Sequence, residues 1–242
     1  MTTILVIPCY NEHESLPVFL GELIRNWNVE DPILIADDSN ESSHKQLCDY
    51  LESLRQQGHN IGVIRGSTKR GRGAAVNEAM KFALSNFRNF DYLIEADADG
   101  SHRPYDVIFM RDYQKESDLL IGSRYLKDSR IMGWSLSRRA MSKFLNFLIP
   151  KVLSIRVSDI TNGLRRYSHR AATEVCSYTS LTSGFVYLSE QALYIKKKKM
   201  KIMEVPIVFM PRLYGSSTVT LRDLVSSLLG IIKIITISIS RK

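Results

Sequence analysis

Short apolar runs alternate with longer stretches of helical periodicity through the first half of the chain. The short runs are rich in β-branched residues and predict strands. Between them, apolar side chains recur every three or four residues, which predicts amphipathic helices. Strands that alternate with helices form a mostly parallel sheet covered on both faces, so the pattern predicts an α/β fold. The strands are expected at residues 4–8, 33–36, 61–65, 91–95 and 118–121, and the helices at 16–27, 43–57 and 71–85.

A polar segment follows every one of these predicted strands. The carboxyl ends of parallel strands meet at one edge of a sheet, and ligands of such sheets bind beyond that edge. Five polar strand ends together are therefore stronger evidence for a ligand site than any single motif. The segments are Tyr10-Asn11-Glu12, Asp37-Asp38, Lys69–Gly73, Asp97–His102 and Gly122–Arg124.

The fourth of these segments contains two carboxylates, Asp97 and Asp99, directly after an apolar run. Two carboxylates at the edge of a buried sheet are costly unless a positive charge lies between them. A hard divalent cation is the usual solution, because it takes oxygen ligands and bridges to substrate phosphates. A polar turn that precedes a helix, with Pro104 in the first helical turn, is the alternative. This motif alone supports both interpretations equally.

Two stretches in the second half are amphipathic. Residues 136–153 mix apolar side chains with arginine and lysine, and residues 221–242 carry an apolar stripe. Either stretch could lie flat in a membrane interface, and either could equally pack as a helix on the sheet. No apolar run reaches the roughly 20 residues that span a bilayer, and the amino terminus lacks the pattern of a signal peptide. The stripe consists of Leu221, Leu224, Val225, Leu228, Leu229, Ile232 and Ile235.

Composition narrows the choice of partners more than the choice of fold. The chain has 242 residues, 44% of them hydrophobic, which suits one large domain or one domain with a small annex. The net charge of +8 favours anionic partners such as nucleic acid, phosphorylated substrates or anionic lipids, and does not choose among them. The three cysteines form no CxxC pair, so neither a zinc site nor a disulfide framework is indicated.

Eight motifs, in order and at matching spacing, resemble those of one family. The chain resembles the polyprenyl-phosphate glycosyltransferases similar to dolichyl-phosphate mannose synthase, within glycosyltransferase family 2 of GT-A fold. It departs from that pattern at Ser39–His44, which replaces Gly-Ser-x-Asp-Gly-Thr, and at Thr218, which replaces a lysine. The motifs are Pro8-Cys9-Tyr10-Asn11-Glu12, Asp37-Asp38, Gly71-Arg72-Gly73-Ala74-Ala75, Asp97-Ala98-Asp99-Gly100-Ser101-His102, Gly122-Ser123-Arg124-Tyr125, Trp134 to Asn146, Ser158 to Arg165, and Glu204-Val205-Pro206-Ile207.

This resemblance implies a donor site that contains a metal ion. Asp97 and Asp99, with Ser101 as a weaker third ligand, would bind Mg²⁺ or Mn²⁺ together with the diphosphate of a nucleotide sugar. The donor-binding residues that the resemblance implies are Pro8, Tyr10, Glu12, Asp37, Asp38, Lys69, Gly73, Asp97, Ala98 and Asp99.

The resemblance also implies a clamp for the phosphate of an acceptor, formed by Arg124, Arg138, Ser142 and Arg212. Arg138 and Ser142 are four residues apart, so they face one side of a helix. Arginine suits the task because its planar guanidinium binds phosphate oxygens in pairs.

Asp159 is a candidate for a further carboxylate at the site, and a structural pairing with Arg165 or Arg166 is at least as well supported. The acceptor phosphate is already ionised near neutral pH, so it can attack without a strong general base. A single in-line displacement would invert the anomeric centre. The catalytic residues expected are Asp99, Arg124, Arg138 and Asp159.

The expected function is metal-dependent, inverting transfer of a sugar from a GDP-mannose or UDP-glucose type of donor to a polyprenyl or dolichyl phosphate. A family 2 glycosyltransferase with a soluble or glycan acceptor is the alternative, and a non-catalytic nucleotide-sugar-binding or membrane-binding subunit is a third hypothesis. We expect a catalytic domain at residues 1–220, with a nucleotide-sugar-binding half at 1–125, an acceptor-binding half at 126–220 and a membrane-associating helix at 221–242. The protein is expected to attach peripherally to the cytoplasmic face of a membrane and to bind no nucleic acid.

Overall fold

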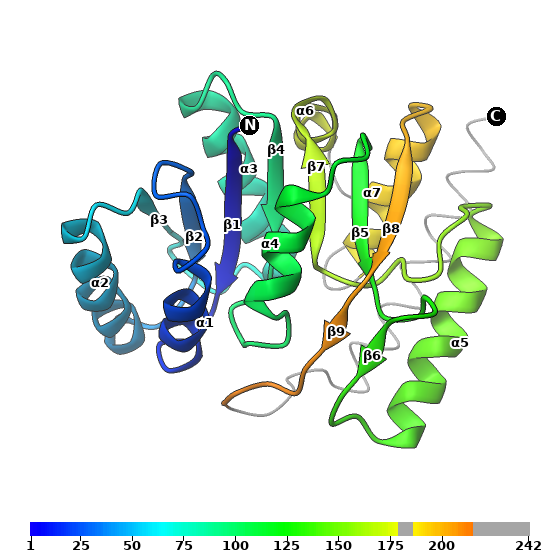
Figure 1. Ribbon diagram of the computed structural model, residues 1–242, viewed down its shortest axis with the longest axis horizontal. Coiled ribbons are helices and arrows are strands. Elements are labelled where there is room, and N and C mark those ends of the chain that lie inside the picture. Colours follow the sequence, from blue (N-terminus) through cyan, green and yellow to red (C-terminus); the bar gives the residue numbers. More distant parts are fainter. Residues whose placement is uncertain (179–185, 215–242) are drawn as a thin grey trace.

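The computed structural model describes residues 1–178 and 186–214. Seven strands form one sheet in the order β3-β2-β1-β4-β7-β5-β8 (Figure 1). All neighbouring strands are parallel except β7, which runs antiparallel to both β4 and β5. The mostly parallel sheet is therefore confirmed. The strands are β1 Thr3–Cys9, β2 Ile33–Asp37, β3 Ile61–Arg65, β4 Tyr92–Glu95, β5 Leu119–Ser123, β7 Arg165–Ser168 and β8 Ile202–Pro206.

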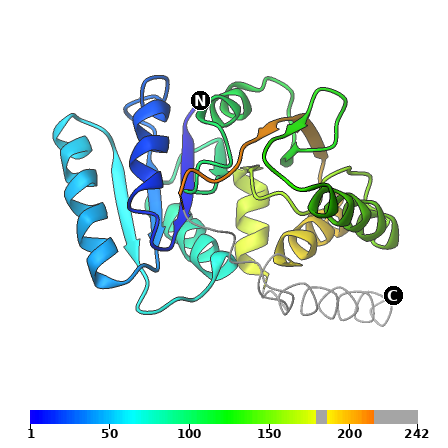
Figure 2. The same cartoon turned by 90° about the horizontal axis from the view of Figure 1, so that it is seen from below.

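Helices cover both faces of this sheet (Figures 1 and 2). Helices α1, α2 and α4 enclose one hydrophobic core, and α3, α6, α7 and the end of α5 enclose the other. Helix α3 buries alanines at helical spacing, and these small side chains let it pack closely against β1 and β2. The helices are α1 Ser15–Leu23, α2 Glu41–Gln56, α3 Arg72–Asn86, α4 Pro104–Asp112, α5 Leu136–Val152, α6 His169–Ser177 and α7 Val186–Lys197.

Strand β7 was not predicted, because its sequence is polar. It begins with Arg165 and Arg166, both fully buried. The guanidinium of Arg165 donates to the backbone carbonyls of Ile160, Asn162 and Leu188. That of Arg166 donates to the carbonyl groups at the end of α4 and in the loop that follows it. Two buried cations thus satisfy backbone acceptors, so a strand without apolar alternation fills the middle of the sheet.

Helix α5 leaves much of its apolar side exposed. Its carboxyl-terminal half enters the core through Asn146, Ile149 and Pro150. The exposed apolar side chains are Leu136, Met141, Phe144, Phe147, Leu148 and Val152. The second amphipathic stretch, residues 221–242, lies outside the described residues. Within residues 1–178 and 186–214, no helix is both long and apolar enough to cross a bilayer.

A small second sheet lies beside the ends of the main strands. Strand β6 (Arg130–Ile131) pairs in parallel with β9 (Val208–Phe209), and β9 follows directly after β8 (Figure 1). This ribbon carries the chain from β8 back across the molecule toward the acidic loop that follows β4. His102 of that loop forms an isolated bridge with Phe209.

Candidate active site

The polar segments predicted at the strand ends come together at one edge of the sheet. The registers align Cys9 with Asp37, and Asp37 with Arg65, at the carboxyl ends of β1, β2 and β3. The loop after β4 joins them, since the amide of Ala96 donates to the carbonyl of Val6. The predicted position of the site at this edge is therefore consistent with the fold.

Both carboxylates after β2 are bound by cationic side chains of the chain itself. Asp37 is fully buried and lies 2.6 Å from His44 Nδ1 and 3.4 Å from Arg65 Nη1. Asp38 accepts from the backbone amide of Arg70 at 2.8 Å and from its Nε at 2.9 Å. Sequence reasoning assigned no role to His44, whose contact with Asp37 spans seven residues of chain across a loop.

An exposed aromatic ring lies on the donor side of this edge. Tyr10 is 41% exposed, and Lys69 Nζ lies 4.1 Å from the centroid of its ring. Glu12 is partly buried, and this burial raises the pKa of its carboxyl group. Its oxygens contact the hydroxyl of Ser15 and, at 3.6 Å, Arg212. An exposed aromatic ring with a cation beside it can bind a nucleoside by stacking.

Asp97 and Asp99 lie just beyond the end of β4 and are held by different arginines. Asp97 Oδ1 accepts from Arg72 Nε at 2.8 Å, and Asp99 Oδ2 forms an ion pair with Arg212 Nε at 3.0 Å. Burial opposes ionisation of Asp97, but the positive charges of Arg72 and, more weakly, of Arg212 hold the pKa of its carboxyl down at about 2. Both positive partners lie far away in sequence, so sequence reasoning, which placed Arg212 with the acceptor phosphate, did not predict these two pairings.

The oxygen atoms around this acidic pair fit a divalent cation. Asp97 is partly exposed, and Asp99 Oδ1 already accepts from the amide of Ser101. The hydroxyl of Ser101 is buried and has no hydrogen-bond partner in the part of the chain that the structure describes. In that part no three carboxylate, thiol or imidazole groups form a metal cage. Mg²⁺ usually takes one or two carboxylates and completes its shell with phosphate oxygens and water, so a carboxylate pair suffices.

Backbone hydrogen bonds hold the segment after β9 against the acidic loop that follows β4. The amide of Met210 donates to the carbonyl of Ser101 at 2.9 Å, and that of Leu213 to Asp99 at 3.0 Å. Gly100 has a φ of +78°, and a Cβ there would lie 2.6 Å from the side chain of Leu213. The glycine therefore permits both the turn and the close approach, which bring Arg212 to the site.

Sequence reasoning also missed how the acidic loop is attached to the second half of the chain. The ring of His102 is fully buried, and its Nδ1 accepts from the amide of Asp97 at 3.0 Å. Nε2 therefore carries the proton and donates to Asn162 Oδ1 at 3.1 Å. The one sequence signal was that His102 and Asn162 both belong to the motifs quoted above.

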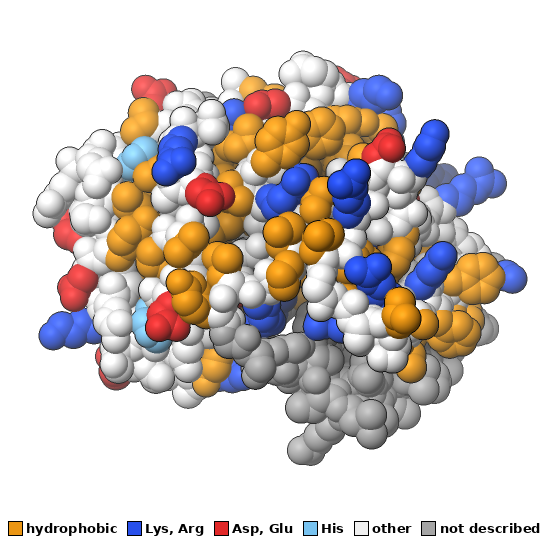
Figure 3. Space-filling model, turned by 60° about the horizontal axis from the view of Figure 1, so that its bottom comes forward, with side chains coloured by type: hydrophobic (Ala, Val, Ile, Leu, Met, Phe, Trp, Pro, Cys, Tyr) orange, Lys and Arg blue, Asp and Glu red, His pale blue; other side chains and the backbone are white. Residues whose placement is uncertain are grey.

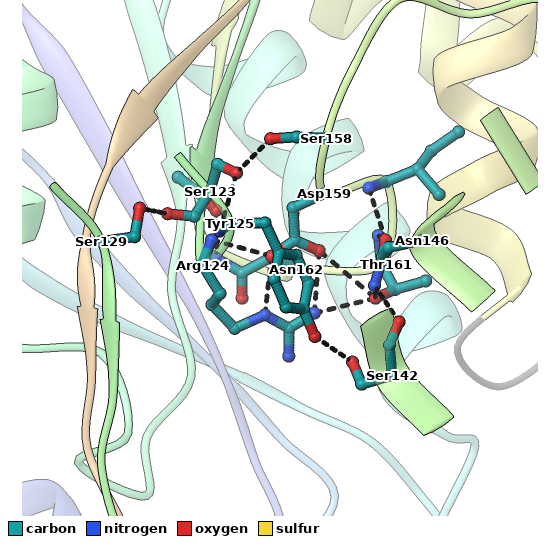
Figure 4. A network of polar contacts seen from close by, with 12 residues as sticks. Ser123, Arg124, Tyr125, Ser129, Ser142, Asn146, Ser158, Asp159, Thr161 and Asn162 are labelled. Atoms are coloured by element: carbon teal, nitrogen blue, oxygen red, sulfur yellow. Dashed lines mark hydrogen bonds and ion pairs between the residues drawn. The ribbon is translucent and has the colours of Figure 1, made fainter. Parts of the chain in front are cut away.

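The proposed acceptor side is built around an ion pair between Arg124 and Asp159 (Figure 4). Asp159 accepts from Arg124 Nε at 2.6 Å and from its Nη2 at 2.8 Å, and Nη2 also donates to Thr161. The hypothesis that Asp159 pairs with Arg165 or Arg166 is wrong, because those arginines bind carbonyl groups instead. Asp159 is fully buried with both oxygens bound, so it is placed to position Arg124 and not to touch a substrate.

Nη1 of Arg124 has no hydrogen-bond partner among the described residues and forms the free end of this unit (Figure 4). Trp134 packs against two guanidinium groups, with Arg138 at 4.2 Å and Arg124 at 5.3 Å from its ring centroid. Partial desolvation of its guanidinium lowers the pKa of Arg138, although the residue as a whole is exposed, and the positive charges of Arg212 and Arg124 lower it further. Of these three cations, Arg212 forms the ion pair with Asp99.

Ser142 lies on the same helix as Arg138, one turn further along α5. Its hydroxyl accepts from the phenol of Tyr125 at 2.6 Å, and its carbonyl from Asn146. The four residues predicted to bind an acceptor phosphate thus come from the residue that follows β5, from α5 and from the segment after β9. Gly73 and Ala98, predicted on the donor side, have packing roles, since Ala98 is buried and a Cβ on Gly73 would meet Tyr187 at 3.0 Å.

The sequence matches one family of proteins. The family model described as glycosyl transferase family 2 matches residues 4–175. An undecaprenyl-phosphate mannosyltransferase from Micrococcus luteus is 30% identical over 218 residues, which cover 90% of this chain and 87% of that protein. A polyprenol monophosphomannose synthase from Mycolicibacterium smegmatis is 29% identical over 216 residues, which cover 89% of this chain and 80% of that protein.

Solved structures show the same fold at lower identity. Glucosyl-3-phosphoglycerate synthase from Mycobacterium tuberculosis, in complex with UDP, superposes with a TM-score of 0.66 at 13% identity, over 97% of this chain and 80% of that chain. A mannosyltransferase from Pyrobaculum calidifontis, in complex with GDP-Man and Mn²⁺, gives a TM-score of 0.62 at 14% identity, over 96% and 64% of the two chains. Identities this low establish the fold alone.

Proposed function

Because the chain belongs to glycosyltransferase family 2 and is a glycosyltransferase, we propose that it moves one sugar from a nucleotide sugar to the phosphate of a polyprenyl phosphate. The relatives from Micrococcus luteus and Mycolicibacterium smegmatis are both named for a prenyl phosphate and for mannose. These names favour a mannosyl donor, and GDP-mannose is the first donor to test. UDP-glucose is the second.

The observation that carries the proposal is that Arg124 and Arg138 share the ring of Trp134 while Arg212 pairs with Asp99. Partial desolvation lowers the pKa of Arg138, and repulsion from the like charges of Arg212 and Arg124 lowers it further. A phosphate between them would relieve this repulsion and accept hydrogen bonds from each guanidinium. The free Nη1 of Arg124 is suitably placed for such a bond.

On the donor side, Asp97 and Asp99, with Ser101, would hold Mg²⁺ or Mn²⁺. When bound, the ion would neutralise charge on the leaving diphosphate. Tyr10 and Lys69 would line the nucleoside pocket together with Glu12, and Asp37 and Asp38 would contribute through the shape of their loop.

The chain's own residues then act by positioning and by charge. Arg124 and Arg138 would hold the ionised acceptor phosphate on the side of the sugar opposite the diphosphate, with Ser142 orienting it. No strong base is needed, because this phosphate is already deprotonated. Catalysis would rest on alignment of the reacting atoms and on preorganised positive charge. In-line attack would invert the configuration at the anomeric carbon.

The test is a transferase assay with purified full-length protein, Mn²⁺ or Mg²⁺, and a short polyprenyl phosphate. Radiolabelled GDP-mannose and UDP-glucose would be compared, and the lipid product extracted and its anomeric configuration determined. We expect labelled, inverted polyprenyl-phosphate sugar with at least one donor. If label enters only water-soluble phosphorylated or glycan acceptors, the enzyme is a family 2 glycosyltransferase with a different acceptor.

We also propose that the protein attaches peripherally to the cytoplasmic face of a membrane, where nucleotide sugars are available and the acceptor phosphate lies at headgroup depth. Helix α5 carries Arg138, and its outward side exposes aromatic residues, including Phe144 and Phe147, at 58% and 64%. Figure 3 shows one face of the molecule, and Lys and Arg side chains gather on its right half, the side on which α5 lies in Figure 1. An apolar surface bordered by cations is typical of helices that lie in an anionic interface.

Changing both Phe144 and Phe147 to glutamate should weaken binding to vesicles of anionic lipid by about tenfold or more. Burying even one phenylalanine is worth about 1.5–3 kcal/mol, and tenfold corresponds to about 1.4 kcal/mol. Flotation with phosphatidylglycerol-rich liposomes would measure the change. Tyr105→Glu on α4 is the matched control, because Tyr105 is 70% exposed on a different helix. Equal flotation of the double variant and the unaltered protein would exclude α5 as the attachment surface.

A further inference from the structure

Arg72, the first residue of α3, is enclosed by groups from three other parts of the fold. Its Nε donates to Asp97 Oδ1 at 2.8 Å. Its Nη1 contacts both the carboxylate of Glu95 and the hydroxyl of Tyr187, and its Nη2 donates to the carbonyl of Gly163 at 3.2 Å. Every nitrogen of the guanidinium therefore has a partner.

The partners of this guanidinium are packed tightly. Glu95 is fully buried, and its second oxygen accepts from the phenol of Tyr167 at 3.2 Å. The ring of Tyr187 lies against Gly73, where a Cβ would come within 3.0 Å of it. Glycine at this place gives the ring room to lie where its hydroxyl reaches Glu95 and Arg72, whereas a Cβ would crowd it. The cluster is thus a built arrangement of four elements and not a surface contact.

Burying these charged groups costs desolvation free energy, and a gain in stability does not explain why the protein keeps them. Buried ion pairs often contribute little to stability, and apolar residues of similar volume can replace them without loss. In some proteins such pairs instead fix geometry, because each charged group must keep its partners. Here the fixed group is Asp97, which is gripped by Arg72 on one oxygen and by His102 through its backbone amide.

Arg72 also differs from the arginines proposed to bind phosphate. Arg212 is 32% exposed in its side chain, and Arg124 retains a free Nη1, whereas Arg72 is 18% exposed with all nitrogens bound. Four of the five N–H groups of Arg72 already donate to protein groups, and the contact with Asp97 is the one that leads to the site. We therefore expect its contribution to the reaction to pass through Asp97.

We propose that Arg72, seated on Glu95 and Tyr187, is a positioning residue that fixes the orientation of Asp97 for the metal ion and the donor diphosphate. This inference rests on the metal role proposed above for Asp97. Loss of an outer partner of a metal ligand typically weakens metal affinity by roughly 10- to 100-fold. Replacing Arg72 should therefore raise the metal requirement without changing the acceptor requirement.

The experiment measures Mn²⁺ binding without turnover, from the electron paramagnetic resonance signal of free Mn²⁺, with and without GDP. We expect Arg72→Leu to weaken binding by roughly 10- to 100-fold and Tyr187→Phe to weaken it less. Arg72→Lys should recover part of the loss, since lysine keeps the charge but lacks the planar fork. In the transferase assay, the half-saturating Mn²⁺ concentration should rise while that of the lipid acceptor stays constant.

Arg72→Leu would leave Glu95 buried without its cation, so the variant could fail to fold. The double variant Arg72→Leu/Glu95→Gln removes that charge as well and keeps the test valid, with thermal unfolding as the check. Arg55→Leu is the matched control, because Arg55 also donates to a backbone carbonyl but lies at the far end of α2. If the double variant is folded and binds Mn²⁺ as tightly as the unaltered protein, the inference is overturned.

The two proposals can fail separately. If the unaltered protein binds no Mn²⁺, with or without GDP, the metal assignment fails and the role of Arg72 fails with it. If the unaltered protein binds Mn²⁺ and Asp97→Asn abolishes binding, but loss of Arg72 has no effect, only the role of Arg72 fails.

Discussion

Replacement of Asp99 by asparagine is expected to lower turnover by about a hundredfold or more while leaving the fold intact. Asparagine keeps the size of the side chain, and its carbonyl can still accept from the amide of Ser101, as Asp99 Oδ1 does at 2.9 Å. What disappears is one negative charge beside Asp97 and Glu12. A metal ion contributes several kcal/mol to stabilising charge in the transition state, and each 1.36 kcal/mol is a factor of ten in rate.

Initial rates at saturating donor and acceptor, over a range of Mn²⁺ concentrations, would measure this loss. Calorimetry of GDP binding with and without Mn²⁺ would show its origin, since the variant should lose the metal-dependent part of the affinity. Asp49→Asn is the matched control, because it makes the same chemical change at an exposed position of α2. Equal GDP affinity of the unaltered protein with and without Mn²⁺ would count against the metal assignment.

Arg124→Ala is expected to destabilise the protein strongly as well as to weaken the acceptor site. The arginine pairs with Asp159, whose side chain is fully buried, and its removal would leave an uncompensated buried charge. Breaking a buried ion pair in this way costs about 3–5 kcal/mol of the free energy of unfolding. In a chain of this size the midpoint of thermal unfolding should fall by roughly 6–20 °C. Circular dichroism during heating would measure it.

Arg138→Ala is the informative comparison, because Arg138 is exposed and packs on Trp134 without an ion-pair partner among the described residues. Its loss should leave thermal unfolding nearly unchanged. A charged hydrogen bond is worth about 1.5–3 kcal/mol, so the half-saturating acceptor concentration should rise roughly 10- to 100-fold. Donor affinity should stay constant. An increase in the donor requirement instead would place Arg138 on the donor side of the site.

Much of the fold follows from local patterns in the sequence. Apolar runs and helical periodicity predict the strands β1 to β5 and the helices α1, α2 and α3, because each pattern is set by which side chains an element must bury. Strand β7 is not predicted by these patterns. Its Arg165 and Arg166 are buried because their guanidinium groups donate to backbone carbonyls, and only folding brings those carbonyls near. A polar sequence then forms an interior strand.

The site divides in a similar way. The strand-end rule places the acidic and basic segments at one edge of the sheet without any knowledge of contacts. The pairing of those charges does not follow, because it depends on segments distant in sequence, such as Arg72 with Asp97 and Arg212 with Asp99. Asp159 illustrates the difference. Its neighbours in sequence suggested Arg165 or Arg166, and its true partner, Arg124, precedes it by 35 residues.

The position of the antiparallel strand β7 also determines when the strands of the sheet can pair during translation. Strand β5 has only β7 and β8 as neighbours in the sheet, and both are translated after it. A nascent chain that ends near residue 125 can pair β1 to β4 but has no place for β5. Its incomplete sheet presents the unpaired edge of β4 until Ser168 has left the ribosome, and unpaired strand edges invite association with other chains. The described sheet is therefore completed only after both the first and the second half of the chain have been synthesised.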